Sequence, residues 1–199
     1  MPRTPRFSRQ DLIDAAVRVC VPHGPGALTI NAVARMAGAP TGSIYHRFAS
    51  REDLLAETWL ATTAAFQAGF VAALRETSQP PGLAAALFAV QWARSHPEAA
   101  RLLLLYRRQD FVRGELPERL REAAGQLAAE LGDAIAGFAL SAFADRGLAA
   151  KRRAAFLVLD LPNAAMRRYL AAGISPPQDV DELVVEAVTT MATTPAASD

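Results

Sequence analysis

Residues 29–55 of the chain read TINAVARMAGAPTGSIYHRFASREDLL, and this stretch decides the fold. Its apolar residues recur at helical rather than strand spacing. Residues 38–40, Gly-Ala-Pro, interrupt the pattern, and Gly38 suits the left-handed position after a helix end. The stretch therefore predicts two short helices, at about 30–37 and 41–48, joined by a tight turn.

The flanking residues predict further helices on either side of this pair. Ser8 is a good N-cap, and the helix it begins has an apolar face made of Leu12, Ile13, Ala16, Val17 and Cys20. Ser50 and Asp53 form a capping box that opens a fourth helix, which continues to about residue 77 and is roughly 40 Å long. Two short helices supported by a preceding amphipathic helix form a helix-turn-helix pattern.

The rest of the chain is also helical in its periodicity, so the predicted fold class is all-α, with about nine helices. Residues 78–82, SQPPG, are the clearest boundary signal. Beyond them we expect helices at 83–95 and 97–108, a loop at 109–116, a long helix from Pro117 to Gly147, and final helices at 151–171 and 178–193. Pro162 is expected to kink the helix at 151–171 because it lacks an N–H group.

Composition and charge place the chain among ordinary globular proteins. Hydrophobic residues make up 51% of it and charged residues 21%, which argues against disorder. Residues 1–48 hold six arginines and two acidic residues, whereas the remainder is mildly acidic, an asymmetry expected if one end meets phosphate or simply carries a solvated face. The single cysteine, Cys20, excludes an internal disulfide. With no signal-peptide core and no membrane span, we expect a cytoplasmic location.

The second helix of the pair has the outer face that a DNA major groove accepts, because its outward residues are small or polar. Those residues are Thr41, Gly42, Ser43 and His46, while Ile44 and Phe48 anchor the helix to the core. Phosphate donors around its edge are Tyr45, Arg47 and Arg51, with the Thr29 hydroxyl and nearby helix amides. Taken singly, each has an ordinary alternative, such as a core-edge tyrosine or a solvated arginine.

The run from Thr29 to Leu55 resembles the DNA-binding signature of the TetR family of regulators. It has the threonine opening the second helix, the Val-Ala pair and glycine before the turn, a hydrophobic-Tyr-x-x-Phe core, and a basic residue, acids and paired leucines opening the fourth helix. The resemblance covers about residues 8–60. It implies phosphate contacts at Thr29, Tyr45, Arg47 and Arg51, and base-reading positions at Asn31, Thr41, Gly42, Ser43 and His46. Pro40 departs from the family, many of whose members carry a capping serine there, so we expect another cap, such as Thr41.

The resemblance also implies a function and a domain organisation. It implies a helix-turn-helix DNA-binding domain at residues 5–60 and a helical ligand-binding and dimerisation domain at 61–199. The expected activity is transcriptional regulation, most often repression, with release from a palindromic operator by a small-molecule inducer. The expected partners are double-stranded DNA and a second copy of the chain, bound through the last two helices at about 151–193.

Two apolar stripes on the last two helices are candidates for that dimer surface. They consist of Phe156, Leu159, Met166 and Leu170 on the first helix, and Val180, Val184, Val188 and Met191 on the second. The alternative is that the stripes close the core of one chain. An inducer pocket could be lined by Trp59, Phe66, Phe88, Trp92, Tyr106, Phe138, Asn163 and Met166. Here too the alternative is that the aromatic residues are packed core.

Two other classes of protein compete with a DNA-binding regulator. An enzyme is disfavoured because the three histidines form no metal-spaced cluster, and neither a Gly-rich phosphate loop nor a Gly-x-Ser-x-Gly elbow is present. We accordingly expect no catalytic residue, no metal and no cofactor. The remaining alternative is a helical protein-interaction module, which would show no salt-dependent DNA binding.

Overall fold

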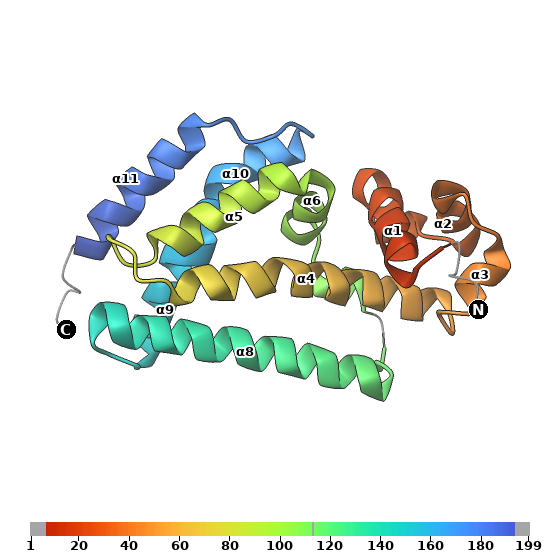
Figure 1. Cartoon of the computed structure of the whole chain (residues 1–199), viewed down its shortest axis with the longest axis horizontal. Helices are drawn as coiled ribbons and strands as arrows, with labels where there is room; N and C mark the ends of the chain where they lie inside the picture. Colours follow the sequence, from red (N-terminus) through yellow and green to blue (C-terminus); the bar gives the residue numbers. More distant parts are fainter. Residues whose placement is uncertain (1–6, 113, 194–199) are drawn as a thin grey trace, which may run out of the picture. The chain divides into compact units, whose positions relative to one another are not determined.

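The computed structural model describes residues 7–112 and 114–193, and these form helices joined by turns, with no β-strand among them (Figure 1). The all-α prediction is confirmed. Arg3 and Arg6, which contribute to the basic N-terminal segment, lie outside the described residues. The chain divides into two compact units. Unit 1 comprises Met1–Thr63 and Arg101–Ala124, and unit 2 comprises Ala64–Ala100 and Gly125–Asp199.

Unit 1 holds the helix-turn-helix pattern. Figure 1 shows three helices grouped beside the start of a fourth: α1 (Arg9–His23), α2 (Ile30–Ala37), α3 (Thr41–Tyr45) and α4 (Arg51–Arg75). A 3₁₀ turn, η1 (Pro25–Ala27), links α1 to the next segment. The unit also takes in the end of α6 (Pro97–Leu105), all of α7 (Arg108–Phe111) and the start of α8 (Glu118–Phe143).

Local capping explains where the first helices begin and end. The Ser8 hydroxyl accepts the Asp11 N–H at 3.1 Å, and the Asp11 carboxylate accepts the Ser8 N–H at 2.7 Å. Thr29 Oγ1 accepts the Ala32 N–H at 3.1 Å, and Gly38 ends α2 with φ 64°. These groups satisfy helix-end donors and acceptors that would otherwise be unpaired, as the sequence predicts.

The core of unit 1 joins the amphipathic face of α1 to α2, α3 and α4. Its fully buried members include Leu12, Leu28, Ile44, Phe48 and Leu54, none of which is more than 1% exposed. Cys20 lies in the same cluster with no exposed surface. The predicted apolar stripe of α1 is therefore the face that packs inward.

Unit 2 contains the remaining helices. Besides the second half of α4 and most of α8 it comprises α5 (Leu83–Ser95), α9 (Leu148–Ala155), a π-helical turn η2 (Phe156–Asp160), α10 (Leu161–Ala171) and α11 (Asp179–Thr193). Both α10 and α11 pack against α5, as Figure 1 shows. The Arg94 guanidinium of α5 stabilises the loop before α11 and the start of that helix. It donates to the Pro176 and Pro177 carbonyls of the loop and pairs with Asp181 of α11 at 2.8 Å.

The structure corrects three details of the predicted elements. Residues 108–111 form the short helix α7 inside the predicted loop at 109–116, where the Asp110 carboxylate accepts the Arg107 N–H. Helix α3 ends at Tyr45 and is followed by a turn at residues 46–47, so Phe48 lies beyond the helix. The backbone disruption at Pro162 includes the π-helical turn η2 immediately before α10, in which the Leu161 N–H bonds to the Phe156 carbonyl.

The apolar stripes assigned to the dimer surface are mostly core of a single chain. Five of their residues are at most 3% exposed: Met166, Leu170, Val180, Val184 and Val188. They are covered because α10 and α11 use these faces to pack on α5. Assigning them to a surface between copies was wrong, and the alternative of core closure holds for these five. Phe156, by contrast, is 46% exposed.

Among residues 7–112 and 114–193, no single helix is both long and apolar enough to cross a membrane. One pair of segments, 118–143 and 148–171, meets the length and hydropathy criteria only when taken together, and the pair is bent by 100°.

Candidate nucleic-acid interface

The candidate interface consists of α2, α3 and the turn after α3 in unit 1. Of the predicted base-reading residues, Asn31, Thr41, Gly42 and His46 are exposed, and Ser43 is half-buried. Ile44 lies on the opposite face with no exposed surface. The short helix therefore presents its small polar residues outward while its apolar residue holds it to the core, which is the geometry that groove insertion requires.

The start of α3 differs from the expected cap. Pro40 occupies the N-cap position, and no side chain caps the helix there. Thr41 is the first helical residue rather than its cap, so that expectation was wrong. The helix is held instead by backbone bonds, including the one from the Ser43 N–H to the Pro40 carbonyl at 2.9 Å. The Thr41 hydroxyl therefore has no capping role that would compete with an outside partner.

The predicted phosphate donors fall into two groups. Tyr45 is 62% exposed, and Thr29 is exposed at the start of α2. Arg47 and Arg51 are instead engaged within unit 1. Arg47 donates to the Ser43 and Phe7 carbonyls at 2.9 and 2.6 Å, and Arg51 donates to the Leu28 and Pro25 carbonyls at 2.5 and 3.1 Å. Each arginine therefore stabilises the backbone around the candidate interface, whatever else it contacts.

Sequence reasoning does not predict the long-range contacts of three charged residues that hold this region together. Arg9, at the start of α1, donates to the Arg47 carbonyl at 2.7 Å, and its guanidinium lies 4.4 Å from the centre of the Phe48 ring. The same guanidinium pairs with Glu57, which is only 7% exposed. Asp53, one helical turn earlier, is 5% exposed. Their i, i+4 spacing on a face of α4 rich in buried residues is the one signal that could have indicated them.

Electrostatic shifts in unit 1 follow these contacts. The hydrogen bond to Glu57 raises the pKa of the Arg9 guanidinium, so this cation stays charged. The bond from the Ser8 N–H lowers the pKa of Asp11 and keeps the capping carboxylate ionised. Burial raises the pKa of the Cys20 thiol to about 12, so at neutral pH it is an unreactive core residue.

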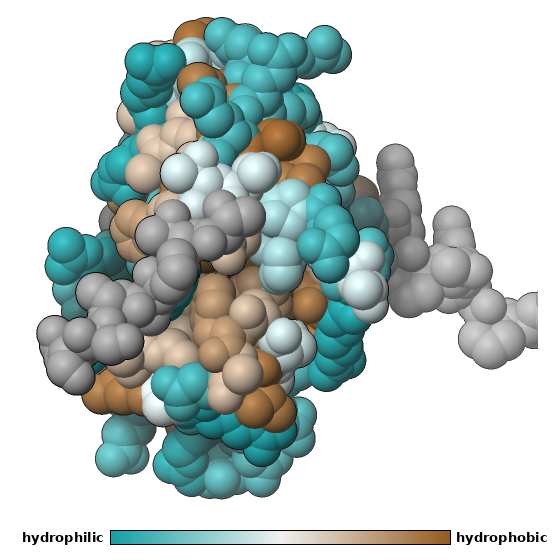
Figure 2. Space-filling model, turned by 90° about the vertical axis from the view of Figure 1, so that its left-hand side faces the viewer, coloured by the Kyte–Doolittle hydropathy of each residue, from teal (hydrophilic) through white to brown (hydrophobic). Residues whose placement is uncertain are grey.

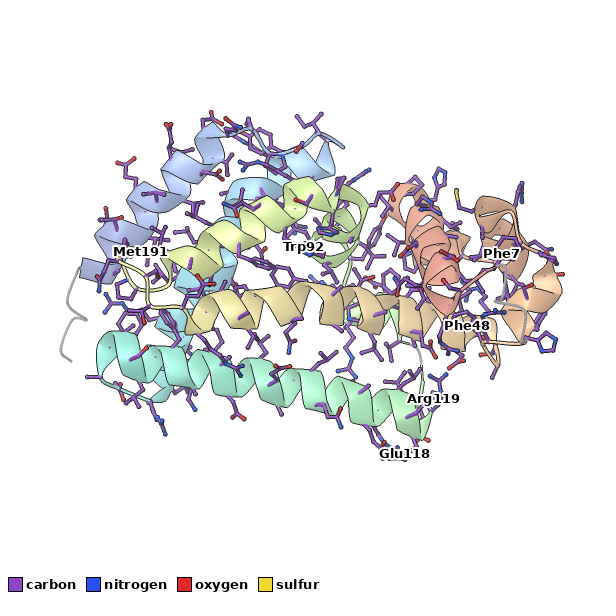
Figure 3. The ribbon with its side chains drawn as sticks, in the orientation of Figure 1. Phe7, Phe48, Trp92, Glu118, Arg119 and Met191 are labelled. Carbon is purple, nitrogen blue, oxygen red and sulfur yellow. The ribbon has the colours of Figure 1, made fainter. Side chains whose placement is uncertain are left out.

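The residues predicted to line an inducer pocket are divided between the two units. Trp59 and Tyr106 belong to unit 1, where each ring packs on Phe111 and the Tyr106 hydroxyl donates to the Val21 carbonyl at 3.1 Å. The other six belong to unit 2: Phe66, Phe88, Trp92, Phe138, Asn163 and Met166. Phe66 is central among the aromatic rings, with its ring centre 6.0 Å from that of Phe88 and 5.1 Å from that of Trp92. Figure 3 labels Trp92 on α5.

Unit 2 has an open pocket of about 470 Å³ beside the end of α4. Its walls are residues 74–79 and Pro81 on one side, and residues of α8 between Asp133 and Ser141 on the other. Phe138 is the one predicted pocket residue that lines it. The lining combines buried apolar side chains with exposed charged ones, including Arg75 and Asp133. In the part of the chain that the structure describes, no group of His, Cys, Asp or Glu side chains could hold a metal ion.

Comparison with known proteins identifies the N-terminal region. Residues 12–58 match the family model of bacterial regulatory proteins, tetR family. Over 120 residues the chain is 29% identical to the HTH-type transcriptional regulator BetI of Rhizobium meliloti (strain 1021). That alignment spans 51% of this chain and 59% of BetI.

Solved structures extend the similarity in fold to nearly the whole chain. The transcriptional regulator FadR from Bacillus subtilis, in complex with stearoyl-CoA, is 15% identical with a TM-score of 0.69, and the match covers 94% of this chain and 98% of that one. The multidrug binding protein EbrR, complexed with imidazole, is 25% identical with a TM-score of 0.57 and coverages of 96% and 98%. The match to the family model over residues 12–58 coincides with the helix-turn-helix of unit 1, so this part of the chain is similar to the bacterial regulatory proteins of the tetR family.

Proposed function

We propose that the chain is a DNA-binding transcriptional repressor that acts in the cytoplasm, with residues 5–60 as the DNA-binding domain. The observation that carries this is the outer face of α3 and of the turn after it, where exposed Thr41, Gly42 and His46 are backed by fully buried Ile44. Phosphate contacts would come from Thr29 and Tyr45, which are exposed, and from Arg47 and Arg51, whose guanidinium groups each carry five N–H donors, more than the bonds described above require. Asn31 and Ser43 complete the proposed base-reading set.

Genomic DNA pulldown with the purified chain tests the proposal. A short palindromic site should be enriched, and its affinity for the protein should fall steeply with salt because binding releases counterions from phosphates. Absence of any enriched palindrome, or binding that salt does not weaken, would instead favour a protein-interaction module.

Tyr45 offers a single-residue test, because its side chain is 62% exposed and therefore accessible to an outside partner. We expect Tyr45→Phe to weaken operator binding by about fivefold, the loss of one phosphate hydrogen bond, and Tyr45→Ala by roughly tenfold or more. Fluorescence anisotropy on the enriched fragment measures both. The control is Tyr169→Phe on α10, which removes a hydroxyl from unit 2 and should leave operator affinity unchanged. Equal affinities for wild type and Tyr45→Ala would exclude Tyr45 from the interface.

We further propose that the chain works as a homodimer and that the last two helices, within about 151–193, supply the interface. The buried stripes are unavailable, so the contact would use apolar residues that stay exposed: Phe156 is 46% exposed, and Leu183 and Val185, which flank buried Val184 on either side of α11, are 54% and 36% exposed. Figure 2 looks at the end of unit 2 and shows hydrophobic side chains gathered between hydrophilic ones. A dimer is what a small helix-turn-helix needs, because two half-sites supply the affinity that one cannot.

Leu183→Glu is expected to dissociate the dimer. In a two-fold interface the substitution buries two unpaired carboxylates, which should weaken association by about 100-fold or more. Light scattering after size-exclusion chromatography measures the mass of the species. Leu140→Glu on α8, at a comparably exposed apolar residue outside the last two helices, is the control and should stay dimeric. Dissociation by Leu140→Glu alone would move the interface to α8.

Ligand control is the remaining part of the proposal. Two structural neighbours were solved with bound small molecules, stearoyl-CoA in FadR and imidazole in EbrR. In this chain the proposed ligand-contacting residues of unit 2 are the ring cluster of Phe66, Phe88 and Trp92 together with Phe138, Asn163 and Met166. A compound that binds there should raise the melting temperature of the protein and release the operator.

A further inference from the structure

Two carboxylates are buried on α4, and of these the sequence indicates Asp53 only as part of a capping box and gives Glu57 no role. Asp53 is 5% exposed and Glu57 is 7% exposed. The two residues are four apart and therefore lie on the same face of the helix. Buried carboxylates are rare unless they are paired, because desolvation of an unpaired charge is costly. The partners of Asp53 and Glu57 therefore identify the segments that these carboxylates connect to α4.

Asp53 accepts the Ala49 N–H at 3.0 Å, and the charged partners of the two carboxylates are arginines from two other helices of unit 1. Arg9 of α1 donates from Nε to Glu57 at 2.7 Å. Arg119, in the first turn of α8, uses one guanidinium nitrogen on Glu57 and the other on Asp53, the latter at 2.5 Å. Figure 3 shows Arg119 at this end of α8 and Phe48 close to the start of α4. Glu57 thus accepts from both arginines, and Arg119 bridges both carboxylates.

Arg9 also contacts the recognition segment, which we define as residues 41–48. It donates from a terminal guanidinium nitrogen to the Arg47 carbonyl at 2.7 Å and lies over the Phe48 ring at 4.4 Å. The N–H groups of Arg47 and Phe48 both bond to the Ile44 carbonyl, so these two residues continue directly from α3. The position of the Arg9 side chain therefore influences the backbone that follows α3, and with it the orientation of the exposed face of α3.

We propose that Arg119 is a positioning residue for DNA recognition, which acts through Glu57 and Arg9 to hold the recognition segment in its binding orientation. The inference rests on the proposed DNA-binding function. Arg119 contributes two of the charged bonds that satisfy the buried carboxylates. Without it, Glu57 and Asp53 are left with surplus negative charge, and Arg9 is drawn from the Arg47 carbonyl toward them. Arg119 itself need not touch DNA.

The experiment compares Arg119→Gln with Arg121→Gln on the enriched operator and on a scrambled duplex. Arg121 provides a matched control, because it lies on the same helix and, among residues 7–112 and 114–193, pairs only with exposed Glu118. Both variants remove one positive charge. We expect Arg119→Gln to reduce operator affinity about tenfold and Arg121→Gln less than twofold, with affinity for scrambled DNA unchanged within about twofold in both.

A double-mutant cycle of Arg119→Gln with Arg9→Gln tests whether Arg119 acts on the recognition segment through Arg9. If Arg119 acts through Arg9, the double variant should bind the operator no more weakly than Arg9→Gln alone. Binding is measured at a temperature where circular dichroism shows every variant to be folded. Should Arg119→Gln fail to fold, Arg119→Lys replaces it, because a single ammonium cannot bridge two carboxylates as the guanidinium does, and a roughly threefold loss of operator affinity is then expected.

The outcomes separate the two proposals. No operator binding by the wild type would reject the proposed function itself. Binding by the wild type with equal operator affinities for the Arg119 and Arg121 variants would overturn the positioning role. Additive losses in the cycle would overturn the route through Arg9. An equal loss on operator and scrambled DNA would make Arg119 a direct phosphate contact instead.

Discussion

Replacement of Phe48 by alanine is expected to lower the free energy of unfolding by about 4 kcal/mol. The ring is 1% exposed, belongs to the core cluster of unit 1, and supports the Arg9 guanidinium. Its removal deletes the buried area of a large side chain and leaves a cavity below the recognition segment. Urea unfolding followed by circular dichroism measures the loss as a lower transition midpoint at unchanged slope.

The control for this prediction is Met36→Ala on α2, in the same unit. Met36 is 46% exposed, so its truncation should change stability by less than about 0.5 kcal/mol. Operator affinity should also fall for Phe48→Ala at temperatures where the variant remains folded, because Ile44 then anchors the segment alone. A similar small loss of stability in both variants would contradict the packing described for Phe48.

Gly82→Ala is expected to destabilise the chain by about 3 kcal/mol. Gly82 precedes α5 with φ 82°, a conformation that alanine adopts only with strain. A Cβ there would lie 2.7 Å from Phe138 Cζ and 2.9 Å from Val158 Cγ1. Both neighbours are buried, and the β-branched valine has few alternative rotamers. Strain and overpacking therefore add.

Gly132→Ala is the matched control, since it makes the same substitution in the same unit. Gly132 lies within α8, is exposed, and has nothing within 4 Å of the added Cβ. Alanine is the better helix former, so this variant should be stabilised by about 1 kcal/mol. Thermal unfolding of the two variants should thus shift in opposite directions. If both variants were destabilised, the loss could not be attributed to the lack of room for a Cβ atom at Gly82, because Gly132 has that room.

Local signals predicted much of unit 1. The caps at Ser8 and Thr29, the left-handed Gly38 and the inward stripe of α1 all occur where the sequence indicates them. Each depends on residues within one or two turns of helix, so its energetics can be evaluated from a short segment. The outward placement of Thr41, Gly42 and His46 follows for the same reason, once Ile44 is buried.

Partners far apart in the sequence could not be predicted. Arg9 meets Glu57 across 48 residues, and Arg119 meets it across 62. In sequence such residues look like solvated helix faces, because nothing nearby indicates a partner. The role of Gly69 could not be predicted either, because it depends on a distant residue. In the sequence Gly69 is a weak helix former within α4, whereas in the structure the Phe88 ring leaves no room for a side chain at this position.

The sequence by itself determined where α1, α2, α3 and α4 begin, the turn between α2 and α3, and which residues of α3 face outward, because caps, turn residues and apolar periodicity act over a few residues. The tertiary structure alone decided which face of α10 and α11 is covered, since an apolar stripe fits the core of one chain as well as a contact between two. It also decided that Arg47 and Arg51 hold backbone carbonyls and that Asp53 and Glu57 are buried. Burial and charge pairing depend on what packs on a helix, and that is set by residues distant in the chain.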